Sequence, residues 1–246
     1  MAEATPTVVL VHGAFADGSS WNGVIELLQA KGLKVVAPAN PLRGISIDSA
    51  YTASVLERID GPVLLVGHSY GGAVISNAAS QADNVVGLVF VCAFAPDDGE
   101  ILGEVAGTSK DSILGPVQVP HKYPDRAGES VELTIDPKGF REAFAADLPA
   151  EQAAVLAATQ RPIAQLAFTE QNGPPAWKHL PSWAIVGTGD RAAGTDLTRS
   201  MAERAGAEIT EAEGSHVIMI SQPEIVAGVI RTAAAAVARP TTTVAS

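Results

Sequence analysis

The sequence contains very little cysteine and few basic side chains. Its 246 residues include one cysteine, Cys92, so no disulfide can form within the chain, and a reducing compartment suits it. Because Cys92 lies in an apolar run, we expect a buried core residue rather than a nucleophile. The 16 Lys and Arg residues are outnumbered by 27 Asp and Glu residues, which gives a formal net charge of −11. Nucleic acids and anionic membranes bind basic patches, so this balance argues against both as partners.

Long hydrophobic runs are also missing from the sequence. No apolar stretch reaches the about 18 residues that a membrane-spanning helix needs. The N-terminus has no basic region followed by an apolar stretch, so we expect no signal peptide and a cytoplasmic location. Hydrophobic residues make up 47% of the chain and charged residues 17%, which is typical of a folded protein. Since there is no repeat or linker, residues 1–246 are predicted to form a single α/β domain.

One motif stands out from this background. An apolar run at 62–66 is followed by Gly-His-Ser-Tyr-Gly at 67–71 and then by small and β-branched residues at helical spacing. This is a G-x-S-x-G motif between a strand and a helix, the context of a nucleophile elbow. Gly67 and Gly71 leave room for a tight turn, and Ser69 occupies a strained conformation at its tip. We therefore predict that Ser69 is a catalytic nucleophile.

Strand and helix patterns alternate on both sides of this motif. The nearly continuous hydrophobic strands predict a parallel sheet covered by helices on both faces. Strands are expected at 7–12, 34–38, before the elbow, and at 85–94, 183–187 and 207–211. Helices are expected at 21–28, 51–59, 71–81, 196–205 and from Pro223, with an irregular loop at 40–49 and a disordered tail from Pro240.

The alternation is interrupted between residues 99 and 178. This stretch contains prolines, glycines and helical patches at 140–147 and 151–159, without a convincing buried strand. An insertion of this size within an α/β domain usually covers the functional site. We predict a helical cap over residues 99–178.

A serine nucleophile needs a base, and the sequence offers five histidines. His12 begins the loop opposite the elbow and His68 is adjacent to the serine, so neither is well placed to act as its base. His121 and His179 lie in or beside the cap, and a solvated surface position explains both. His216 follows the last expected strand, at the carboxyl edge of the sheet where catalytic groups collect. It is predicted to be the general base and later the general acid.

The base in turn needs a carboxylate that fixes its tautomer and stabilises its cation. Asp190 follows the strand at 183–187 through Thr-Gly, again at the carboxyl edge, and gives the chain order Ser, Asp, His. An ordinary turn also explains a Gly-Asp pair. Asp190 is the predicted acid, and Asp97 or Asp98 at the end of the preceding strand is the alternative.

An oxyanion formed at the serine needs preorganised hydrogen-bond donors. We expect one donor to be the N–H of Tyr70, directly after the nucleophile. The other is expected from the first loop at Ala14, or at Phe15, with Gly13 allowing close approach of the backbone. Phe15 is also a predicted substrate contact. Six aromatic residues are candidates for an apolar lining of the site, although core packing is the simpler explanation for each one. They are Phe15, Tyr70, Phe140, Phe144, Phe168 and Trp177.

With these residues in view, the chain resembles an α/β-hydrolase fold protein. It is most similar to the compact subgroup of methyl-salicylate-type esterases and hydroxynitrile lyases and their bacterial relatives. The resemblance rests on His-Gly-Ala-Phe, Gly-His-Ser-Tyr-Gly-Gly, Val-Phe-Val-Cys-Ala-Phe-Ala-Pro, Gly-Thr-Gly-Asp and Gly-Ser-His-Val. It implies ester hydrolysis through an acyl-enzyme on Ser69, without a cofactor.

The lyases of that subgroup carry a Thr after the first-loop His and a Lys after the catalytic His. Gly13 and Val217 stand at these positions here, so the esterase branch is favoured. Other chemistry of this fold is an alternative to ester hydrolysis, namely that of a lactonase, a perhydrolase, a C–C hydrolase or a hydroxynitrile lyase. A ligand-binding receptor on a hydrolase scaffold is a further alternative.

Metal and nucleotide sites are not predicted. No histidine pair has H-E-x-x-H spacing, and Gly187-Thr188-Gly189 lacks the third glycine of a dinucleotide turn and the lysine of a phosphate loop. The expected partner is a small-molecule ester, and the sequence is compatible with a homodimer.

Overall fold

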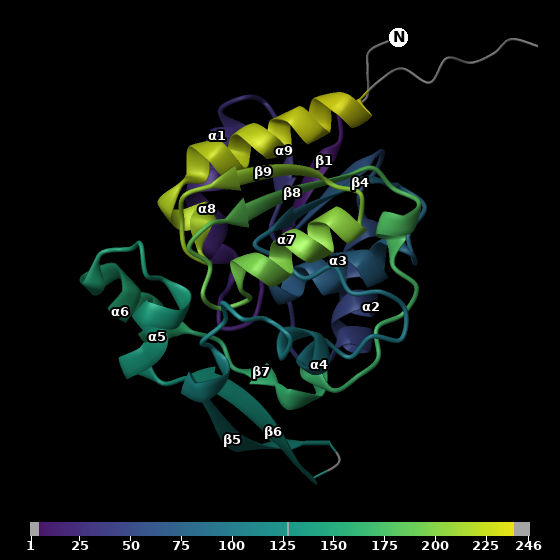
Figure 1. The fold of residues 1–246 in the computed structure, drawn as a ribbon. Helices are drawn as coiled ribbons and strands as arrows, with labels where there is room; N and C mark the ends of the chain where they lie inside the picture. Colours follow the sequence, from purple (N-terminus) through teal and green to yellow (C-terminus); the bar gives the residue numbers. More distant parts are fainter. Residues whose placement is uncertain (1–4, 127, 239–246) are drawn as a thin grey trace, which may run out of the picture.

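A computed structural model describes residues 5–126 and 128–238 and contains a large parallel sheet (Figure 1). Its strand order is β2-β1-β3-β4-β8-β9, and every neighbouring pair is parallel. The strands are β1 (Thr7–Val11), β2 (Val35–Val36), β3 (Val63–His68), β4 (Val85–Val91), β8 (Ser182–Gly187) and β9 (Glu208–Ala212). The predicted parallel α/β sheet is therefore confirmed. The tail predicted to be disordered from residue 240 lies outside the described residues.

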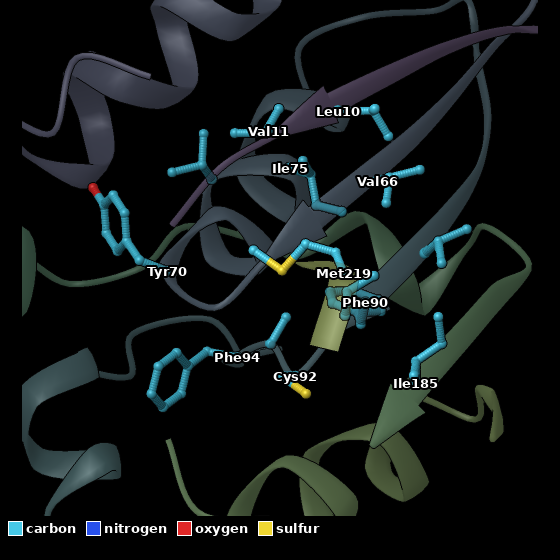
Figure 2. Packing of buried hydrophobic residues seen from close by; sticks show 14 of the residues in the cluster. Leu10, Val11, Val66, Tyr70, Ile75, Phe90, Cys92, Phe94, Ile185 and Met219 are labelled. Atoms are coloured by element: carbon cyan, nitrogen blue, oxygen red, sulfur yellow. The ribbon is translucent and has the colours of Figure 1, made fainter. Parts of the chain in front are cut away.

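The central strands are buried because both of their faces are covered. Every residue of β1, β3 and β8 is buried, which explains why these strands read as unbroken runs of valine, leucine and isoleucine. Figure 2 shows part of this core, where Leu10 of β1, Val66 of β3 and Phe90 of β4 lie together. Strand β2 is shorter than the predicted 34–38, since it forms the sheet edge and Val36 is exposed.

Helices cover the two faces of the sheet as predicted (Figure 1). One face carries α1 (Asn22–Gln29), α8 (Ile218–Ser221) and α9 (Pro223–Val237), and the other carries α2 (Ile45–Leu56), α3 (Tyr70–Ala79) and α7 (Thr195–Arg204). Helix α2 begins in the segment that we expected to be irregular. Its buried face includes the polar residues Asp48, Ser49 and Thr52, so the apolar stripe that marks a helix in a sequence is missing.

The prediction that the cap at residues 99–178 is helical is only partly correct, because the cap also contains strands. Helices α5 (Pro137–Phe144) and α6 (Ala150–Thr159) match the expected patches, and α4 (Leu102–Ala106) precedes them. The cap also contains an antiparallel sheet of β5 (Gln118–Asp125), β6 (Gly128–Ile135) and β7 (Ile163–Ala164). Most side chains of β5 and β6 are partly or fully exposed, and β5 contains two prolines, so no apolar run signals these strands.

The strand order places four loops at one edge of the sheet. The chain moves from β1 to β2 on one side and then to β3 on the other side of β1. The loops after β1 and β3 therefore separate at a topological switch point, the usual ligand position in open α/β sheets. Because β8 and β9 are neighbours, the loops after these strands also lie side by side.

His12, directly after β1, connects two of the loops at this edge. Its Nδ1–H donates to the carbonyl of Gly13 at 2.9 Å, and its Nε2 accepts from the N–H of Asn40 at 3.0 Å. The Asn40 side chain donates back to the carbonyl of His12 at 3.0 Å. Burial lowers the pKa of His12 to about 4, so the imidazole is neutral at physiological pH and can accept the Asn40 hydrogen bond.

This burial predicts a pH dependence of stability. A histidine in the unfolded chain takes up a proton near pH 6.5, whereas folded His12 resists protonation until about pH 4. As pH falls between these values, protons favour the unfolded state, so the free energy of unfolding should decrease by about 3 kcal/mol. Urea unfolding at pH 7, 6, 5 and 4 measures this loss.

The His12→Gln variant is the control, because its amide does not titrate. Its unfolding free energy should fall less steeply over the same pH range. Equal pH dependence in the native and variant proteins would rule out His12 as the source.

Candidate active site

Ser69 lies at the turn between β3 and α3 in a strained backbone conformation. Its φ of 55° and ψ of −125° are unusual for a residue with a side chain. The N–H of Ser69 donates to the carbonyl of Val91, and its own carbonyl accepts from Phe94. A Cβ at Gly67 would lie 2.5 Å from the carbonyl oxygen of Gly71, and a Cβ at Gly71 would lie 2.5 Å from the carbonyl oxygen of Val11, so glycine is needed at both positions of the motif. The sharp turn predicted from the sequence is present.

His216 and Asp190 form a buried hydrogen-bonded pair. The Nδ1–H of His216 donates to Oδ2 of Asp190 at 2.8 Å, and each residue is only 1% exposed. The other carboxylate oxygen of Asp190 accepts the N–H groups of Ala192 and Ala193 at 2.9 and 3.1 Å. The carboxylate is thus held from both sides, and with Nδ1 as the donor, Nε2 of the neutral imidazole is an acceptor.

The pairing of β8 with β9 brings these two residues together. Beyond the strands, Thr188 N–H donates to the carbonyl of Ala212 and Gly189 N–H donates to that of Gly214, both at 2.9 Å. The two loops therefore run alongside each other as far as the Asp–His pair. Asp97, the alternative acid, forms an ion pair with Lys178 instead, and Asp98 is exposed.

A second histidine supports the loop that carries His216. His68 precedes Ser69, and its Nε2–H donates to the backbone carbonyl of His216 at 2.9 Å. The two imidazole centroids are 4.6 Å apart. Burial, and then the neighbouring His216, lower the pKa of His68 well below its usual value, so the ring is neutral. No sequence pattern predicts this contact, because it joins residues that are 148 positions apart.

Ser69 and His216 line one cavity of about 650 Å³ beneath the cap. Ala14, Phe15 and Tyr70, the other predicted site residues, line it as well. Among the suggested aromatic residues, Phe144 and Phe168 also contribute, whereas Phe140 and Trp177 do not line it. Phe94, which we did not single out, is a lining residue. The cap supplies further lining through Ile101, Glu104, Leu114, Gln118, Leu133 and Gln165.

Tyr70 and Ala14, the residues predicted to supply the oxyanion donors, both line this cavity. Tyr70 is the first residue of α3, where a helix leaves its N–H without an intrahelical acceptor. Ala14 lies on the loop after β1, and this loop touches the elbow. A Cβ at Gly13 would lie 2.6 Å from the Cβ of Ser69 and 2.7 Å from the carbonyl oxygen of His68. Only glycine allows the first loop to approach the serine this closely.

The side chain of Tyr70 is fixed by a carboxylate on α2. Its hydroxyl donates to Oδ2 of Asp48 at 2.8 Å, and Figure 2 shows this hydroxyl pointing away from the core. The carboxylate also accepts the backbone N–H of Arg43. Burial raises the pKa of Asp48, although these hydrogen bonds oppose the increase. The ring that borders the cavity is thus anchored at its far end.

The remaining predictions concern histidines, metals and membranes. His121 and His179 are exposed, as expected for surface residues. Within residues 5–126 and 128–238, no group of three or more His, Cys, Asp or Glu side chains is arranged to hold a metal ion. Over the same residues, every helix is too short or too polar to cross a lipid bilayer.

Comparison with known proteins reveals related sequences and folds. A model of the alpha/beta hydrolase family matches residues 8–229. A pyrethroid hydrolase of Sphingobium wenxiniae is 35% identical over 99 residues, which is 35% of this chain and 35% of that protein. Methylesterase 8 of Arabidopsis thaliana is 35% identical over 103 residues, or 36% and 38% of the two chains. These alignments thus span little more than a third of each relative.

A solved structure agrees over a longer range. The crystal structure of polyneuridine aldehyde esterase superposes with a TM-score of 0.78 over 93% of this chain and 99% of that one, at 21% identity. This likeness supports the fold assignment. The predicted resemblance to the methylesterase subgroup is confirmed by the methylesterase match.

The contact between the first loop and the elbow gives a testable prediction. In Gly13→Ala, the added methyl group must displace either Ser69 or the peptide after His68, and a displacement of about 1 Å at a catalytic centre can cost about 100-fold in rate. We expect turnover of esters, the reaction that the sequence predicts, to fall at least tenfold and the melting temperature to decrease, as measured by ester turnover and calorimetry.

Gly18→Ala is the matched control, since a Cβ there meets only the carbonyl of Ala37 at 3.6 Å. It should retain normal activity. Equal activity of the two variants would contradict a role for close approach at Gly13.

Proposed function

This chain belongs to the alpha/beta hydrolase family, and we propose that it is a carboxylesterase that cleaves small to medium uncharged esters through an acyl-enzyme on Ser69. The observation that carries the proposal is the cavity shared by Ser69 and His216, with His216 hydrogen-bonded to Asp190 at 2.8 Å. Nucleophile, base and orienting acid are the groups that acyl transfer requires.

In the proposed reaction, His216 accepts the proton of the Ser69 hydroxyl as the oxygen attacks the ester carbonyl. Asp190 holds the imidazole in the tautomer with Nδ1–H and stabilises the cation that forms. The hydrogen bonds from Ala192 and Ala193 keep the carboxylate oriented toward the ring. The imidazolium then returns the proton to the departing alcohol oxygen, and the acyl group remains on Ser69.

The tetrahedral intermediate carries a negative oxygen. We propose that the N–H groups of Tyr70 and Ala14 stabilise it, because both residues line the cavity next to Ser69. A water molecule, deprotonated by His216, attacks the acyl-enzyme in the second half of the reaction. The acid is released and Ser69 recovers its proton.

The cavity supports an uncharged substrate. Among the described residues that line it there is no Lys or Arg, and Glu104 is the one acidic residue. Its volume of about 650 Å³ lies within the range of small-molecule pockets. Aromatic and aliphatic side chains predominate near Ser69. Phe15 is a proposed substrate contact, and the cap over residues 99–178 is proposed to serve as the lid of the single domain.

Names of relatives point in the same direction. The two related proteins described above are named as a hydrolase and as a methylesterase. We extend ester hydrolysis to this chain as part of the proposal. The buried, unpaired Cys92 is compatible with a cytoplasmic location.

The first test compares the native protein with Ser69→Ala on p-nitrophenyl acetate and butyrate. Loss of a triad nucleophile typically costs about 1000-fold or more, so turnover should fall to near the uncatalysed rate. Ser76→Ala is the control, because it removes a hydroxyl that has no hydrogen-bond partner from α3, the helix that follows Ser69. This variant should retain activity.

Each other outcome of this test is informative. Turnover that survives Ser69→Ala would exclude Ser69 as the nucleophile. Very slow turnover by the native protein would favour a receptor on a hydrolase scaffold over an esterase.

The charge of the cavity gives a second test. The native enzyme should hydrolyse methyl p-nitrophenyl glutarate faster than the anionic mono-p-nitrophenyl glutarate, because Glu104 repels the free carboxylate. Exposed charge interactions are worth up to about 1 kcal/mol, so Glu104→Gln should narrow the ratio of kcat/KM by about threefold. Glu151→Gln alters an exposed cap residue outside the cavity and should leave the ratio unchanged.

A ratio unaffected by Glu104→Gln would show that the Glu104 charge does not select substrates. High salt should narrow the native ratio in the same direction, since it screens exposed charges.

A further inference from the structure

Asp147 of the cap binds the loop that carries the proposed base. It follows α5, and its Oδ2 accepts the backbone N–H of Ser215 at 2.8 Å. Its Oδ1 accepts the hydroxyl of the same serine. Ser215 is 3% exposed and directly precedes His216. One carboxylate thus holds both donors of the residue next to the base.

Two hydrogen bonds to His216 itself come from residues at the carboxyl edge of the main sheet. His68 at the end of β3 donates to the carbonyl of His216, and Asp190 after β8 accepts from its Nδ1. These two bonds fix the carbonyl side and the ring of His216. The bond from Asp147 fixes the peptide on the amino side of the residue. Of the three residues that hold His216 and the peptide before it, Asp147 is the one that belongs to the cap.

The same cap helix also touches the imidazole. Phe144, the last residue of α5, has its ring centroid 5.0 Å from that of His216, with the rings at 61° to each other. Phe144 is buried and also packs edge-on against Phe15. Cap residues 144 and 147 therefore contact the ring of His216 and the backbone that precedes it.

The carboxyl of Asp147 is suited to this contact at neutral pH. Burial raises its pKa, but interactions with the hydroxyl of Ser215, the hydroxyl of Ser221 and the N–H of Ser215 together outweigh burial and leave the pKa below its usual value. The carboxyl group is therefore ionised at neutral pH, and a charged acceptor forms stronger hydrogen bonds than a neutral one.

We propose that Asp147 is a positioning residue for His216, so that the orientation of the base depends on the seating of the cap. The inference rests on the proposed function, because it assumes that His216 acts as the base for Ser69. Asp147 does not touch the reacting atoms. It acts by restricting the backbone rotation that would turn the imidazole away from the serine.

In this proposal, the Asp147–Ser215 contact couples the position of the cap to the orientation of the His216 imidazole. When the cap sits against the sheet, Asp147 engages Ser215 and the imidazole is held toward the cavity. If the cap moves outward to admit a substrate, the Ser215 contact loosens and the base loses one of its restraints. Proton transfer is then efficient only when the cavity is covered.

The test begins with Asp147→Ala and Asp147→Asn. Small misplacements of a catalytic group cost large factors in rate, so we expect kcat to fall about tenfold in Asp147→Ala with KM within twofold of the native value. Asp147→Asn keeps one acceptor oxygen and should lie between the native protein and the alanine variant. The rate at which a phosphonate ester labels Ser69 should fall in parallel.

Asp136→Ala is the matched control. Asp136 caps the start of α5 by accepting the N–H of Lys138 at 3.0 Å. The variant therefore removes a hydrogen-bonded carboxylate at the opposite end of α5 from Asp147. It should keep kcat within about twofold. If it lowers kcat as much as Asp147→Ala does, the effect comes from helix stability and the proposal is wrong.

A double-variant cycle isolates the proposed contact. Ser215→Ala removes the hydroxyl donor and should lower kcat in the native background. In the Asp147→Ala background the same change should have no further effect, because its partner is already gone. Fully additive effects would refute coupling between the two residues.

A spectroscopic measurement separates this inference from the proposed function. The Nδ1 proton of His216, assigned by its loss in His216→Ala, reports on the bond to Asp190 without any substrate. Its resonance should shift or broaden in Asp147→Ala and remain unchanged in Asp136→Ala. An unchanged resonance and unchanged kcat would overturn the positioning role. A native protein that hydrolyses no ester, yet shows the expected change in the resonance, would refute the proposed function alone.

Discussion

The strained backbone of Ser69 is the constraint on which the rest of the site depends. A φ of 55° at a residue with a side chain costs about 1 to 3 kcal/mol, which neighbouring structure must offset. Bonds from Ser69 to Val91 and from Phe94 to Ser69 tie the turn to the end of β4. Gly67 removes the side chain that would block the returning chain, and Gly13 allows the first loop to close over the elbow. The buried sheet is thus rigid, and this rigidity fixes the positions of the loops at its edge.

Three buried histidines at this edge differ in role because their partners differ. His12 is neutral and connects the loops after β1 and β2 through Asn40. His68 is also neutral and supports the backbone of His216. His216 alone bonds to a carboxylate, Asp190, through its ring. Residue type therefore does not identify a base, whereas the pattern of partners does.

The cap interrupts the chain without interrupting the sheet. It is inserted between β4 and β8, which pair directly, so the sheet does not depend on cap residues for continuity. The cap nevertheless lines the cavity and contacts the His216 loop through Asp147. In the proposed mechanism, substrate preference and alignment of the base therefore both depend on this one inserted segment.

Features that depend on local pattern can be predicted from the amino-acid sequence alone. Alternating hydrophobic strands and helices predicted the parallel sheet, and the glycines around Ser69 predicted the sharp turn. Positions after strands placed Asp190 and His216 at the same edge, since parallel strands end together.

Other features became visible only in the folded chain. The fold shows that Asp190 rather than Asp97 is the partner of His216. It also reveals the helical start of α2, the antiparallel sheet of the cap, and the contacts of His68 and Asp147. These features join residues far apart in the chain or lack an apolar stripe, and periodicity in a sequence records burial along one element but not which distant side chains meet.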